Sequence, residues 1–171
     1  MELITSIKMK TMIHKAFKIA ALSIFTLSIS SNGFSQSVNE EVDLIQSIYG
    51  MEKKEVIAEF LGDAVNEDFW NIYDVYETKR KELGKQRVKL LSNYVDNYSQ
   101  MKGDNADDMV KQAEKLSSSQ AKLISQYTKQ VRKVAGSEVA AQFYQIEHYL
   151  LSATRTEIFE NIPFIGELRT N

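Results

Sequence analysis

The sequence predicts an all-α fold, an elongated antiparallel hairpin or bundle of about four helices that follows a signal peptide. The chain of 171 residues has only 7 Gly and 1 Pro, so long segments contain no helix breaker. Apolar residues recur at spacings of three and four along the exported part, as on one face of a helix. No segment shows the alternation that is typical of a β-strand.

Residues 1–35 have the composition of a secretory signal peptide. Lysines precede a short apolar run, Ile19–Ile29, and the small residues Gly33 and Ser35 follow it. The run is shorter than the roughly 20 residues of a membrane-spanning helix. We therefore expect cleavage near residue 35, a single helical domain over 36–171 and no stable membrane insertion after cleavage. The alternative is an uncleaved anchor or an amphipathic membrane helix.

Four helices are predicted, at about 40–61, 66–100, 105–135 and 138–161. Gly62 suits the end of the first, and Asn66 can cap the second. Arg132 and Lys133 precede Gly136 at the end of the third, and the fourth ends before Pro163. Because the two long helices are joined by a short loop, they are expected to run antiparallel. The near-heptad spacing of the third leaves an extended coiled-coil dimer as the rival arrangement.

The composition predicts no cofactor or metal and no nucleic-acid partner. Cysteine is absent, which excludes disulfides and thiolate chemistry. The formal net charge is −2 and no basic patch is visible, whereas nucleic-acid binding needs one. His148 is the single histidine outside the leader, so a zinc site is disfavoured. The acidic stretch after Asp104 lacks the glycine and the glutamate of a calcium loop.

Glu147 and His148 form the most conspicuous candidate for acid–base chemistry. They are adjacent on the fourth predicted helix, at the flank of the stripe that contains Phe143, Ile146 and Leu150. General-base catalysis needs a histidine oriented by a partner and aimed at a nucleophile, and no such set is visible. We therefore predict a core helix with this pair at its margin, no catalytic residue and no enzyme.

A protein-binding face is predicted on the second helix, at Tyr73, Tyr76, Arg80 and Arg87. Tyrosine combines an apolar ring with a polar tip, which suits adaptable binding surfaces, and the two arginines would meet acidic clients. In the alternative interpretation, the arginine stems cover apolar surface and their heads reach water or carboxylates. The tyrosines would then belong to the core.

The last hundred residues or so resemble a group of small, largely uncharacterised exported bacterial proteins. The resemblance depends on Phe69-Trp70, Tyr73, Tyr76, Tyr94, Tyr98, the FYQIE segment Phe143–Glu147 and Ile162-Pro163. More distantly the layout resembles periplasmic stress proteins of the Spy/CpxP type, helical hairpins that dimerise into a cradle. That family's Leu-Thr-x-x-Gln motif is absent; the segment LGDAVNEDFW stands in its place.

The resemblance implies a function in binding rather than in catalysis. Spy/CpxP-like proteins act as ATP-independent chaperones or as regulators of envelope stress signalling. We therefore expect a non-enzymatic periplasmic protein that binds envelope proteins or unfolded clients. The alternative is an accessory or sensory subunit that modulates a membrane sensor or an envelope complex, and a homodimer is a further expectation.

Overall fold

The computed structural model describes residues 50–167, apart from the side chains at positions 157 and 161. The predicted signal peptide and the first part of the first predicted helix lie outside these residues. Every regular element within 50–167 is helical, which confirms the all-α class. The elements are residues 50–61, the 3-10 turn η2 (Gly62–Ala64), α3 (Glu67–Asp96), the 3-10 turn η3 (Tyr98–Gln100) and α4 (Asp104–Asn161).

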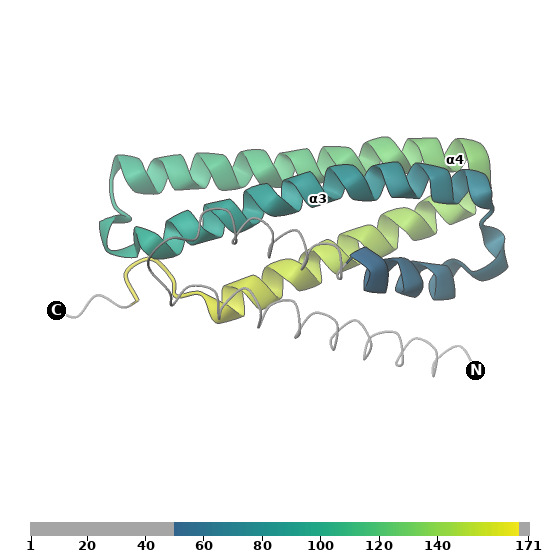
Figure 1. Cartoon of the computed structure of the whole chain (residues 1–171). Coiled ribbons are helices and arrows are strands. Elements are labelled where there is room, and N and C mark those ends of the chain that lie inside the picture. The colour runs from purple at the N-terminus through teal and green to yellow at the C-terminus, as the bar shows by residue number, and fades with distance from the viewer. Residues whose placement is uncertain (1–49, 168–171) are drawn as a thin grey trace, which may run out of the picture.

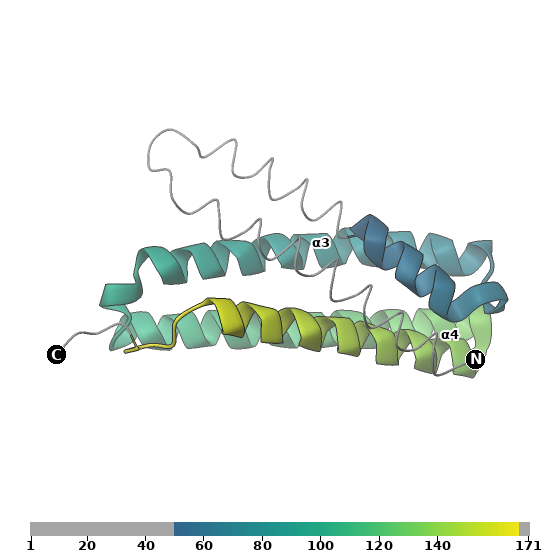
Figure 2. The same cartoon turned by 90° about the horizontal axis from the view of Figure 1, so that it is seen from below.

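The helices lie lengthwise beside one another, and α3 and α4 pack antiparallel (Figures 1 and 2). The long helix α4 bends back on itself at Gly136, so we call residues 104–135 its first arm and residues 137–161 its second arm. Figure 1 shows α3 and the first arm in one layer, with residues 50–61 and the second arm in a layer below them. Residues 50–61 cover only the end of the assembly at which α4 bends.

Gly136 alone reverses the chain within α4. Its backbone has φ 83° and ψ 175°, a conformation that is essentially restricted to glycine. From the sequence, two separate helices were expected here, 105–135 and 138–161, joined by a turn of two or three residues. No longer linker is needed, because one glycine in this conformation turns the chain by itself.

The start of α3 agrees with the sequence, whereas its end lies earlier than expected. Asn66 caps the helix, since its side-chain oxygen accepts a hydrogen bond from the Phe69 N–H at 3.1 Å. The helix ends at Asp96 and does not continue to residue 100. The Asn97 side chain donates to the Asn93 carbonyl at 3.0 Å and so offers the backbone an alternative to continued helix.

The core is assembled from all four helical stretches, with aromatic rings at its centre. Phe143 of the second arm lies edge-on to Phe69 and Tyr76 of α3, with ring centroids 6.4 Å and 5.3 Å apart. Its buried members are Val56, Ile57, Leu61, Phe69, Tyr73, Tyr76, Leu123, Ile124, Tyr127, Val131, Val139, Ala140, Phe143, Ile146 and Leu150. The stripe of the last helix therefore faces the core, as its spacing predicts.

Candidate functional site

A cluster of charged side chains is buried between residues 50–61, α3 and the second arm of α4. The ammonium group of Lys53 donates to Glu77 Oε1 at 2.5 Å and to Glu147 Oε2 at 2.8 Å. The Tyr76 hydroxyl donates to the same oxygen of Glu147 at 2.5 Å, and Arg80 Nε donates to Glu77 Oε2 at 2.8 Å. Lys53 and Glu147 are each 3% exposed and Glu77 is 8% exposed, so the cluster is shielded from water.

The electrostatics of this cluster favour the ionised form of the Glu77 carboxylate. Burial alone raises the pKa of Glu77, but the charges and hydrogen bonds of Lys53 and Arg80 outweigh it and lower that pKa. Burial, with the nearby carboxylates, raises the pKa of Tyr73 and of Tyr76 well above their ordinary range. The two phenols therefore stay neutral while Glu77 stays ionised.

The cluster connects three stretches of chain and offers no exposed reactive group. Lys53 also lies over the Tyr76 ring, 5.0 Å from its centroid, which adds a cation–π contact. Two buried oxygens, Tyr73 Oη and Glu147 Oε1, make no hydrogen bond within the described residues. Since an unsatisfied buried polar atom costs about 1–3 kcal/mol, the cluster specifies how residues 50–61 dock more than it stabilises them. We call this cluster, which consists of Lys53, Tyr76, Glu77, Arg80 and Glu147, the ionic lock.

The structure places the four predicted binding residues differently from the expectation. Tyr73 and Tyr76 are 0% and 2% exposed, so they belong to the core and form no surface face. Arg80 donates to Glu77, and Arg87 donates to the side-chain oxygen of Gln120 on the first arm. The difference has a simple cause, because both tyrosines lie at core spacing and the Tyr76 hydroxyl donates to the buried carboxylate of Glu147.

Glu147 and His148 separate as neighbours on a helix should, but only His148 lies at the margin. Glu147 was expected beside the stripe and is instead buried within the ionic lock. His148 is half-buried, and its ring lies against Tyr144 with centroids 4.3 Å apart. The burial of Lys53, Glu77 and Glu147 was not predicted from the sequence. Each falls on the apolar side of its helix, and that position could have indicated a buried charge.

The described residues contain no group of three or more His, Cys, Asp or Glu that could hold a metal ion. None of the helices within residues 50–167 is long and apolar enough to cross a membrane.

A turn after α4 presents large apolar side chains to solvent. The Tyr94 hydroxyl donates to the Pro163 carbonyl at 2.5 Å, and the Tyr98 hydroxyl donates to the Phe164 carbonyl at 2.6 Å. The Phe164 N–H donates to the Glu167 carboxylate at 2.7 Å, which closes the turn. We call residues 163–167 the C-terminal turn. Phe164 is 66% exposed and Ile165 is 47% exposed, although the backbone of the turn is fixed by these hydrogen bonds.

Comparisons of the chain with protein-family models, with curated proteins and with solved structures gave no match. The motifs behind the predicted resemblance nevertheless have a physical role in this structure. Glu147 of FYQIE accepts from Tyr76, Phe143 packs on Phe69, and Pro163 accepts from Tyr94. These residues hold the helices together, so the motifs contribute to the fold.

Proposed function

We propose that the protein is a non-enzymatic helical protein of the periplasm that binds other envelope proteins, in the manner of an ATP-independent chaperone. The observation that carries this proposal is the C-terminal turn, where Phe164 and Ile165 are exposed on a backbone held by two tyrosine hydroxyls. Contiguous exposed apolar side chains can mark interaction sites, and Phe164 and Ile165 are adjacent in the chain.

The buried charges support binding over catalysis. The charged groups that are buried together, Lys53, Glu77 and Glu147, form ion pairs through Lys53 and are shielded from solvent. The periplasmic location is supported by the lysines, the apolar run and the small residues of the N-terminal segment.

Further apolar side chains outside the turn would widen the surface available to an unfolded client. Phe159, on the last turns of α4, is 58% exposed, and Tyr149 is 37% exposed. A client chain would bind reversibly, because these residues are separate and none lies in a deep cavity.

An aggregation assay tests this function. The protein, in several-fold molar excess over a denatured client, is expected to suppress the light scattering of that client without added nucleotide. Serum albumin at the same mass concentration controls for crowding. Absence of suppression would refute the chaperone function.

The second candidate function is that of an accessory subunit for a membrane sensor or an envelope complex. The observation in its favour is that the C-terminal turn is fixed at two carbonyls, which suits one defined partner better than many. Affinity capture from an envelope extract distinguishes the two functions. A single stoichiometric partner, together with no suppression of client aggregation, would support the accessory subunit.

A further inference from the structure

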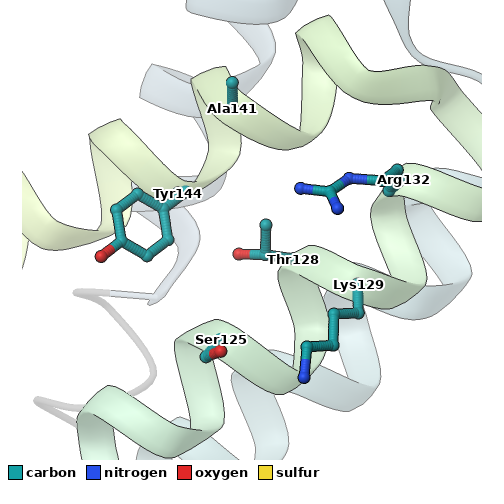
Figure 3. Close-up of a pocket in the computed structure, with 6 residues that line it drawn as sticks. All are labelled: Ser125, Thr128, Lys129, Arg132, Ala141 and Tyr144. Atoms are coloured by element: carbon teal, nitrogen blue, oxygen red, sulfur yellow. The ribbon is translucent and has the colours of Figure 1, made fainter.

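A hollow of ≈ 340 Å³ lies between the two arms of α4, near the bend (Figure 3). It is lined by Ser125, Thr128, Lys129 and Arg132 from the first arm and by Ala141 and Tyr144 from the second. In Figure 3 the Arg132 guanidinium extends into the space between the arms, and Lys129 lies along the outer rim. The hollow is thus a surface site with cations on one side and an aromatic ring on the other.

The charge of the hollow is uncompensated within residues 50–167. Neither Lys129 nor Arg132 forms an ion pair or a hydrogen bond with another described side chain. The Thr128 hydroxyl already donates to the Ile124 carbonyl at 2.8 Å, so it contributes its methyl group to the lining. Arg132 and the hydroxyls of Ser125 and Tyr144 remain as donors. This donor set is complementary to a carboxylate, which an arginine can bind through two parallel hydrogen bonds.

The shape of the hollow distinguishes a peptide from a simple ion. Ser125 and Arg132 are two helical turns apart, roughly 10 Å at 1.5 Å per residue. An extended peptide advances about 3.3 Å per residue, so about three residues would span this length. A small inorganic ion would engage Arg132 and leave Ala141 and the Tyr144 ring uncovered. A peptide with a carboxylate next to an apolar side chain would contact both Arg132 and the Tyr144 ring.

We propose that this hollow binds a short, extended, acidic segment of a partner protein, with one carboxylate on Arg132 and an apolar side chain against Tyr144. The proposal rests on the proposed function and specifies the chemistry of the partner. Lys129, on the rim, contributes long-range attraction and no fixed bond.

An NMR titration of the full chain tests the proposal with two capped peptides, Gly-Asp-Leu-Glu-Gly and its amide counterpart Gly-Asn-Leu-Gln-Gly. The acidic peptide is expected to shift the backbone amide signals of Arg132, Ala141 and Tyr144 saturably, and the amide peptide is not. Arg132→Gln should weaken binding about five- to tenfold, and Lys129→Gln about twofold. Lys89→Gln, an exposed lysine of α3, is the charge-matched control and should leave binding unchanged.

Several outcomes would overturn the proposal. Equal binding of the amide peptide, or equal loss in Lys89→Gln and Arg132→Gln, would show that the hollow recognises no carboxylate. Saturable shifts at the same three residues with inorganic phosphate alone would indicate a general anion site. Binding to vesicles that contain an anionic phospholipid, with none to the peptide, would indicate a lipid surface instead. The client aggregation assay tests the C-terminal turn and not the hollow. A negative peptide titration would therefore leave the result of the aggregation assay unchanged, so failure of this proposal can be distinguished from failure of the proposed function.

Discussion

Replacing Lys53 by methionine is the most informative perturbation of the ionic lock. Methionine retains much of the apolar stem of lysine but removes the ammonium group that bridges Glu77 and Glu147. Glu77 would keep its contact with Arg80, whereas Glu147 would keep only the Tyr76 hydroxyl. The substitution therefore leaves a buried carboxylate without an ionic partner.

The expected cost follows from the burial of both groups. Removing one partner of a buried ion pair typically destabilises a protein by about 3–5 kcal/mol. For a chain of this length each kcal/mol lowers Tm by roughly 2–4 °C, so Lys53→Met should lower Tm by roughly 6–20 °C. Thermal unfolding followed by circular dichroism measures this shift directly.

Lys54 provides the matched control, because it is adjacent and also forms an ion pair. Its 2.5 Å contact with Asp74 is solvent-exposed, at 43% and 58% of the two side chains. Exposed pairs are worth about 0–1 kcal/mol, so Lys54→Met should hardly move Tm.

A second substitution tests whether the carboxylate left without an ionic partner is that of Glu147. Adding Glu147→Gln to Lys53→Met should recover part of the loss, because the amide is neutral and still accepts a hydrogen bond from Tyr76. Equal Tm values for Lys53→Met and Lys54→Met would refute the existence of a buried ionic lock.

Three further predictions concern pH, the bend and the last helix. Because the pKa values of Tyr73 and Tyr76 are raised in the folded state, their contribution to stability is intact below about pH 10 and is lost as the pH rises above it; urea unfolding measured across this range should show the decline, and pH-independent stability would contradict it. Gly136→Ala should destabilise by about 1–3 kcal/mol through backbone strain alone, since no atom lies within 4 Å of the added methyl group; an unchanged denaturant midpoint would disprove this. Phe143→Ala should cost about 3–5 kcal/mol and His148→Ala little, and the opposite ranking in a thermal melt would show that the wrong side of the helix was assigned to the core.

The helical class was predictable because the relevant signals are local. The Asn66 cap, the scarcity of glycine and the spacing of the apolar residues each depend on a few neighbours in sequence. Gly136 was visible as a break, but its backbone angles were not, so a longer turn was expected there. The early end of α3 depends on how the Asn97 side chain bonds its own helix, which competes closely with helix continuation.

The candidate site was poorly predicted because it depends on contacts between distant parts of the chain. Lys53 and Glu147 are separated by 94 positions, and nothing in either local sequence indicates that they meet. Tyr73 and Tyr76 were assigned to a binding face, with the core as the alternative, because tyrosine suits both environments. Only the packed structure decides between the two. The C-terminal turn was likewise hidden, since Tyr94 and Pro163 are brought together by the return of α4.

The central functional claim is that unfolded clients bind at the C-terminal turn. It is tested most directly by comparing two double variants in the client aggregation assay. Phe164→Asn with Ile165→Asn removes the exposed residues of the turn, whereas Val75→Asn with Val110→Asn removes apolar residues, 52% and 48% exposed, from the helices. We predict that the first pair abolishes suppression and that the second retains it. Equal activity of the two pairs would contradict the claim.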